Sequence, residues 1–142
     1  MTWVDEREAA FPADIPGNTA IVVTDTLDAE VAAAPAGTYF LVMTHSHPLD
    51  QALAEAILTR ADFAYFGLIG SLSKRRQFER RMAARGIAPT RFADMTCPIG
   101  IPGIKGKEPA TIAIAVAAEL LQARERAMGA LTSGTTAGKV QA

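Results

Sequence analysis

Apolar and polar positions form long blocks along this chain, and three of the apolar blocks end abruptly in a polar turn. The three junctions are YFLVMTHSHPLD (39–50), FAYFGLIGSLSKRR (63–76) and MTCPIGIPGIKGKEP (95–109). Each turn contains glycine or proline and opens a segment with helical periodicity. A continuous apolar run before an amphipathic helix is typical of a parallel strand buried on both faces. The pattern therefore predicts an α/β fold.

Strands and helices are expected to alternate along most of the chain. Strands are predicted at 1–4, 19–25, 38–43, 63–69 and briefly within 92–99, and helices at 27–34, 49–60, 71–85 and 109–128. Gly86 is placed to end the third helix in a left-handed conformation, and Pro109 suits the first turn of the fourth. This order predicts a doubly wound, mostly parallel sheet with helices on both faces.

Composition narrows the class of protein. The 142 residues, 49% of them apolar, suffice for one domain with a real core. The net charge of −1 selects neither nucleic acid nor an anionic membrane. No apolar run reaches the ~20 residues that cross a bilayer, and the first residues do not resemble a signal peptide. A single cysteine fits a reducing cytoplasm.

The beginning of the chain departs from a dinucleotide-binding domain. Such a domain opens with a strand and a G-x-G-x-x-G turn, whereas this sequence begins with TWVD. Asp5 then stands where the ribose-binding acid of the next strand would lie. Either the first strand is missing, which would leave a gap between the strands ending at Asp5 and His45, or the domain is not a nucleotide binder of that type.

The first junction carries four candidate polar residues: Thr44, His45, His47 and Asp50. Two histidines at i, i+2 beside an aspartate could bind a metal, but no third ligand is obvious. Ser46 or His47 could instead lead into a helix, with Pro48 in its first turn and Asp50 near its positive end. A polar ligand pocket explains the two imidazoles better, since imidazole both donates and accepts near neutral pH.

The second junction combines the features of an anion site. Gly70 permits close approach of a ligand to the backbone, and Ser71 is placed as an N-cap, so free N–H groups point outward there. Lys74 and Arg75 follow one turn later, which together suggests a phosphate cradle. The alternative is a capped, solvated basic helix that buries a stripe of apolar residues. Little aromatic interleaving argues against a nucleic-acid face.

The third junction is a rigid loop. Three glycines and three prolines lie within residues 97–109, among them Gly100. Lys107 precedes a helix start, which is another place favourable to anions. Cys97 could be a soft ligand or a thiolate, although a lone cysteine is more often a small buried apolar residue. Nucleophilic catalysis would need a positioned base.

At these residues the chain resembles a known family, the xanthine dehydrogenase accessory proteins of the XdhC/CoxI type, in their C-terminal domain. The resemblance rests on the THxHxLD motif at 44–50, the GLIGSxxKRxxF motif at 67–78 and the CPIGxPGIxxKEP motif at 97–109, with VDER near the start. It covers roughly residues 2–122. Two parts of the full-length family members have no counterpart here: an N-terminal domain, and the first Rossmann strand with its glycine-rich turn.

The resemblance implies a truncated Rossmann-like domain, which we place over 1–128. The small, polar composition of the last residues predicts a disordered tail over 129–142. The resemblance also implies a chaperone and not an enzyme. Such a protein binds molybdenum cofactor (molybdopterin) as cargo and passes it from a biosynthetic protein to apo xanthine dehydrogenase in the cytoplasm. The expected contacts are Asp5, Thr44, His45, His47, Asp50, Gly70, Ser71, Lys74, Arg75, Cys97, Gly100 and Lys107, with no resident metal.

Two alternatives stay open. One is an NAD(P)-type oxidoreductase fragment in which Asp5 holds a ribose, although the missing glycine-rich turn counts against it. The other is an interaction module that docks a partner through the basic helix. In each case the unpaired strand edges left by a missing first strand predict self-association or low stability.

Overall fold

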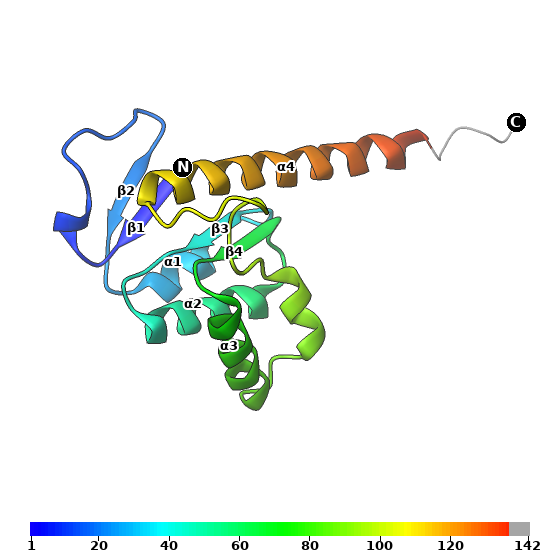
Figure 1. Cartoon of the computed structure of the whole chain (residues 1–142), viewed down its shortest axis with the longest axis horizontal. Coiled ribbons are helices and arrows are strands. Elements are labelled where there is room, and N and C mark those ends of the chain that lie inside the picture. The colour runs from blue at the N-terminus through cyan, green and yellow to red at the C-terminus, as the bar shows by residue number, and fades with distance from the viewer. Residues whose placement is uncertain (137–142) are drawn as a thin grey trace, which may run out of the picture. The chain divides into compact units, whose positions relative to one another are not determined.

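The computed structural model describes residues 1–136. The chain divides into two compact units, Met1–Pro98 and the part from Ile99 onward. Figure 1 labels the elements of both. The first unit contains all four strands and three of the α-helices, and the second contains the long helix α4.

The strands of the first unit form two separate parallel pairs. β1 (Thr2–Asp5) pairs with β2 (Ala20–Val23) in the register Thr2 to Ala20, and β3 (Tyr39–Val42) pairs with β4 (Tyr65–Leu68) in the register Tyr39 to Tyr65. Within the described residues no ladder joins the two pairs. The expected gap between the strands that end near Asp5 and His45 is therefore present, and the α/β, Rossmann-like class is confirmed.

The helices of the first unit begin and end close to their predicted positions. α1 (Leu27–Ala33), α2 (His47–Arg60) and α3 (Leu72–Ala84) follow β2, β3 and β4, while a 3₁₀ turn, η1 (Glu8–Ala10), follows β1. Ser46 and Ser71 cap α2 and α3 by accepting the Leu49 and Lys74 N–H groups. Gly86 adopts φ 93° just after α3, as predicted.

The core lies around the second strand pair. All four residues of β4 are buried, so its apolar run is covered on both faces. The run 38–43 was predicted to be buried in the same way, but in β3 only Val42 is buried and Tyr39 is 38% exposed. The largest fully buried apolar side chains come from α2, β4, α3 and the segment after it: Ile57, Leu58, Phe66, Leu68, Phe78, Met82 and Met95. The β1–β2 pair is more exposed, with Ile21 and Val23 open to solvent.

The last strand is shorter than predicted. Residues 89–94 form a second 3₁₀ helix, η2 (Pro89–Asp94), and only Thr96 joins the sheet. Thr96 accepts from the Leu68 N–H at 2.9 Å and donates to Phe66 O at 2.8 Å. The strand ends there because Pro98 has no N–H with which to continue a ladder.

The second unit is a loop followed by α4 (Pro109–Thr136), which begins at Pro109 as predicted. Gly100 has φ 100° and donates its N–H to Glu119 Oε2 at 2.6 Å. α4 continues through 129–136, which the sequence placed in a disordered tail, because each added residue of a formed helix gains a hydrogen bond. The rest of that predicted tail, 137–142, lies outside the described residues. No helix of the described part is both long and apolar enough to cross a membrane.

Candidate functional site

A cavity lies where β3 and β4 end and α2 and α3 begin. Its volume is about 290 Å³, and it is lined by Thr44, His45, His47, Asp50, Ile69, Gly70, Ser71 and Lys74. All of these except Ile69 are predicted site residues. The first two junctions of the sequence therefore meet at one place, as the carboxyl ends of neighbouring parallel strands must.

A buried ion pair forms the inner wall of this β3–β4 cavity. Lys74 Nζ donates to Asp50 Oδ2 at 2.6 Å and to Ile69 O at 2.9 Å. The Asp50 side chain is 1% exposed and that of Lys74 is 9% exposed. Because one charge neutralises the other away from water, Lys74 connects α3 to α2 and is not a freely available cation.

The same aspartate shapes the turn after β3. Asp50 Oδ1 accepts from the Thr44 N–H at 3.0 Å and lies 2.8 Å from the Thr44 hydroxyl. That hydroxyl also accepts from the Ser46 N–H at 3.1 Å. Asp50 and Thr44 therefore hold residues 44–46 in place and so set the backbone from which both histidines project.

Gly70 is required by close packing. A Cβ at this position would lie 2.6 Å from Lys74 Cδ and 3.5 Å from Cys97 Sγ. Any side chain would thus displace the lysine stem from the path that leads to Asp50. The sequence predicted that a ligand would approach the backbone closely at Gly70. In the structure the group that approaches is the Lys74 side chain.

Two helix starts face the cavity. At α3, Ser71 accepts the Lys74 and Arg75 N–H groups, whereas the N–H groups of Leu72 and Ser73 have no acceptor within the described residues. At α2, the His47 N–H is in the same situation. These groups lie at the positive ends of helices of 13 and 14 residues and would favour an anion.

Both histidines are exposed at the mouth of the cavity. His45 Nε2 lies 3.4 Å from Glu6 Oε1, which follows β1. His47 is the first residue of α2. The described residues contain no group of three or more His, Cys, Asp or Glu side chains that could hold a metal ion.

Asp5 does not line this cavity. Arg7 binds both of its oxygens, with Nε 3.0 Å from Oδ1 and Nη2 3.0 Å from Oδ2, and the Arg7 N–H donates to Oδ1 at 2.9 Å. These hydrogen bonds hold the pKa of the Asp5 carboxyl below its usual range. A carboxylate occupied in this way is poorly placed to bind a ribose, which counts against the dinucleotide interpretation.

Arg75 points away from the cavity and joins α3 to the segment that follows it. Nε pairs with Glu79 Oε1 at 2.7 Å, while Nη1 and Nη2 donate to Cys97 O at 3.2 Å and Phe92 O at 2.9 Å. Spacing alone placed Arg75 beside Lys74 in a phosphate cradle. The fold shows that these neighbouring cations have different partners, Asp50 for Lys74 and Glu79 with two backbone carbonyls for Arg75.

Cys97 lies behind Gly70, with 2% of its surface exposed. Burial raises the pKa of its thiol, and the positive charges of Lys74 and Arg75 oppose that shift only in part. The neutral thiol is a poor nucleophile and a poor metal ligand. The geometry matches the simpler interpretation of a small buried side chain next to the site.

The last two predicted residues belong to the second unit. Gly100 is fixed by its hydrogen bond to Glu119, as described above, and Lys107 is exposed just before α4. The residue that the sequence analysis missed is Ile69. Its contribution is a backbone carbonyl that accepts from Lys74, and the only signal for it was its place at the end of an apolar run.

Comparison with known proteins agrees with this geometry. Residues 1–120 match the XdhC Rossmann domain. The chain is also 28% identical over 125 residues to the uncharacterized protein YqeB of Escherichia coli (strain K12), an alignment that covers 88% of this chain and 23% of that relative. The chain thus spans about a quarter of the relative's length. Because the family match covers most of the chain and every residue of the β3–β4 cavity, the protein belongs to the XdhC Rossmann domain family.

Proposed function

We propose that this domain is an accessory factor that holds molybdenum cofactor as cargo for xanthine dehydrogenase. Membership of the XdhC family supports the general role. The observation that carries the proposal is the convergence of two helix starts and two exposed histidines on the β3–β4 cavity. Unpaired N–H groups suit the cofactor's phosphate, and imidazoles can donate to or accept from the polar edges of a pterin.

The size of the cavity limits how much of the cargo it holds. Its 290 Å³ is at the lower end of the roughly 300–1,000 Å³ of small-molecule sites. We therefore expect one end of the cofactor to enter and the rest to stay accessible. Such partial enclosure fits a protein that must release its cargo to a partner.

A chaperone role also fits the side chains at this site. Catalysis by Cys97 would require a thiolate, and its burial favours the neutral thiol. Lys74 and Arg75 contribute to the site indirectly, since their charges hold Asp50 and the backbone near Cys97. The anion contacts that we propose are therefore the N–H groups at the start of α3, with His45 and His47 at the rim.

The test is a double variant, His45→Ala with His47→Ala. Both side chains are exposed, so the fold should survive. Loss of two net hydrogen bonds of about 1 kcal/mol each predicts roughly tenfold or greater weakening of molybdopterin binding, measured by pterin fluorescence. Gln77→Ala, exposed on α3 outside the cavity, is the matched control.

Delivery is tested separately. The wild-type protein loaded with cofactor should activate purified apo xanthine dehydrogenase, and the histidine double variant should activate it less at equal protein concentration. If the wild-type protein carries no molybdopterin or molybdenum after incubation with cofactor, the cargo proposal is wrong. If it binds cofactor but transfers none, the proposed acceptor is wrong.

The partners we propose are apo xanthine dehydrogenase and a protein that supplies the cofactor, both in the cytoplasm. We also propose that the domain self-associates, because β1 and β3 each present an edge without a ladder partner in the described residues. Light scattering after size exclusion should then report a mass above that of one chain. A monodisperse monomer with a sharp thermal transition would contradict this.

A further inference from the structure

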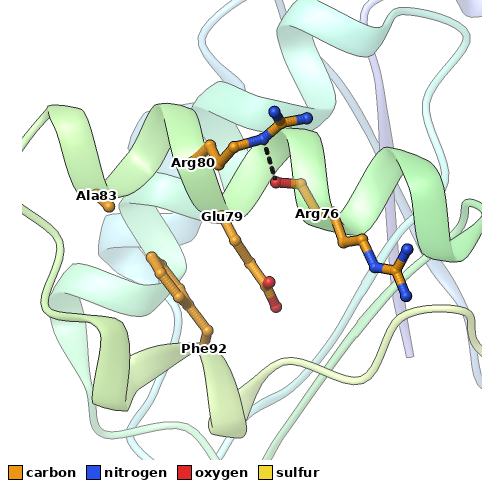
Figure 2. Close-up of a pocket in the computed structure, with 5 residues that line it drawn as sticks. All are labelled: Arg76, Glu79, Arg80, Ala83 and Phe92. Carbon is orange, nitrogen blue, oxygen red and sulfur yellow. Dashed lines mark hydrogen bonds between the residues drawn. The ribbon is translucent and has the colours of Figure 1, made fainter.

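A second depression lies on the outer flank of α3, against η2. Figure 2 shows its five lining residues: Arg76, Glu79, Arg80, Ala83 and Phe92. Its volume is about 550 Å³, larger than the β3–β4 cavity. Four of the residues follow one face of α3, since positions 76, 79, 80 and 83 repeat at helical spacing. We call this feature the α3 groove.

The α3 groove has an apolar floor and a cationic rim. Ala83 and the largely buried ring of Phe92 form the floor, and the aliphatic stems of the two arginines extend it. Arg75 donates to Phe92 O at 2.9 Å and so fixes the floor to α3. A side chain that enters the groove would therefore meet a preformed surface.

The two rim arginines have no carboxylate partner within the described residues. The contrast with their neighbours is clear, because Arg75 pairs with Glu79 at 2.7 Å and Arg85 with Glu55 at 2.9 Å. Arg80 Nε donates to Arg76 O at 3.3 Å, drawn as a dashed line in Figure 2, so its guanidinium lies along α3 while its side chain contributes to the lining of the groove. Glu79 is the only acid in the lining, and Arg75 neutralises it.

Leu72 extends the same face of α3 by one turn. It is 59% exposed, although it is a large apolar side chain on an otherwise polar flank. The face therefore reads as leucine, arginine, arginine and alanine along about three turns. A face that carries cations between apolar side chains is complementary to one that carries acids beside an apolar side chain.

We propose that the α3 groove docks a segment of a partner protein that carries two acidic side chains one helical turn apart around an apolar anchor. The carboxylates pair with Arg76 and Arg80, and the anchor rests on Phe92 and Ala83. Arginine is suited to this role because its planar guanidinium binds a carboxylate through two parallel hydrogen bonds. The surface is separate from the β3–β4 cavity, so the inference does not depend on the proposed cargo.

A nucleic acid fits this surface less well. The whole chain has a net charge of −1, so it lacks the overall basic excess that favours binding of a polyanion. The ring of Phe92 is 9% exposed, which leaves a small apolar contact surface in the groove but no open face on which a base could stack. Single-stranded DNA therefore serves as the contrasting probe.

The first test uses a short, fluorescently labelled helical peptide with two glutamates one turn apart around a leucine. In fluorescence anisotropy the full chain should bind it, and a peptide with glutamine for glutamate should bind about tenfold or more weakly. The variant Arg76→Gln with Arg80→Gln should bind the glutamate peptide more weakly than wild type by the same factor. Its control is Ala29→Glu with Ala52→Glu, which makes an equal change in net charge at exposed positions of α1 and α2.

The second test separates docking from simple charge attraction. Ala83→Gln keeps both arginines but places a polar side chain on the floor of the groove. It should weaken binding of the peptide by about tenfold. Circular dichroism checks that each variant is folded. Any one of three results would overturn the proposal. The peptide could bind wild type and Ala83→Gln with equal affinity, or the control variant in α1 and α2 could weaken binding as much as the arginine variant does. The third is that single-stranded DNA binds more strongly than the acidic peptide.

Discussion

The two flanks of α3 use the same kind of residue in different ways. On the flank toward α2, every described cation has a partner: Lys74 binds Asp50, Arg81 donates to Gln51 at 3.3 Å, and Arg85 pairs with Glu55. On the flank toward η2, Arg75 pairs with Glu79, whereas Arg76 and Arg80 line an open groove and pair with no acid in the part of the chain that the structure describes. One helix therefore carries both structural cations and cations free to meet a partner.

The difference shows why a basic helix is ambiguous in sequence. A run such as SKRRQFERR predicts an anion-binding face. Its one lysine, however, pairs with a buried aspartate on another helix. The cations that remain available, Arg76 and Arg80, are those that pair neither with the acids of α2 nor with Glu79. Four predictions test this comparison, and they are ordered from the largest expected effect on stability to the smallest.

Removal of the Lys74 charge should lower the free energy of unfolding the most. Lys74→Met leaves Asp50 buried without a counter-charge, which typically costs about 3–5 kcal/mol. The free energy of unfolding in urea would measure it. Adding Asp50→Asn removes the stranded charge and should recover a large part of the loss. Lys74→Met with a stability equal to that of Arg76→Met would show that the two flanks do not differ.

A side chain at Gly70 should disturb the same ion pair less severely. Gly70→Ala forces the Lys74 stem to move, and overpacking of this kind costs about 1–3 kcal/mol. Gly17→Ala is the matched control, because a Cβ there has nothing within 4 Å. It should change thermal stability little, or raise it slightly through the unfolded chain. Equal midpoints for the two alanine variants would contradict the role assigned to Gly70.

Burial of Cys97 behind Gly70 predicts a smaller effect on the free energy of unfolding, and this effect depends on pH. Its pKa is raised above the usual 9.0, so in alkali the unfolded chain loses the thiol proton before the folded chain does. Its contribution to stability is therefore complete below the usual pKa and is lost as pH rises through the raised one. The difference in unfolding free energy between wild type and Cys97→Ala should shift against wild type only at alkaline pH. A difference constant with pH, or rapid alkylation of the folded protein at neutral pH, would contradict this.

The outer flank should tolerate substitution. Arg76→Gln with Arg80→Gln removes two exposed charges that pair with no acid, so each change should alter the unfolding free energy by no more than about 0.5 kcal/mol. Equilibrium unfolding in urea measures this alongside Lys74→Met. A loss comparable to that of Lys74→Met would mean that the rim arginines are structural, and the comparison between the flanks would fail.

Local sequence determined the elements of this protein and the place where its site forms. Apolar runs marked the strands, and Ser46, Ser71, Gly86 and Pro109 marked helix ends, because capping and left-handed turns depend on neighbouring residues alone. The gap in the sheet followed from the lack of a first strand with a G-x-G-x-x-G turn ahead of the TWVD segment. Strand ends carry polar turns, so the position of the β3–β4 cavity could be predicted.

Tertiary structure decided which side chains meet in that cavity. The pairing of Lys74 with Asp50, across 24 positions of sequence, depends on how α2 and α3 pack, and no local pattern encodes that. The same packing turned Arg75 toward Cys97 and left Arg76 and Arg80 at the edge of a groove. Successive residues of a helix project about 100° apart, and burial of Phe78 and Met82 in the core sets which of the basic side chains faces α2.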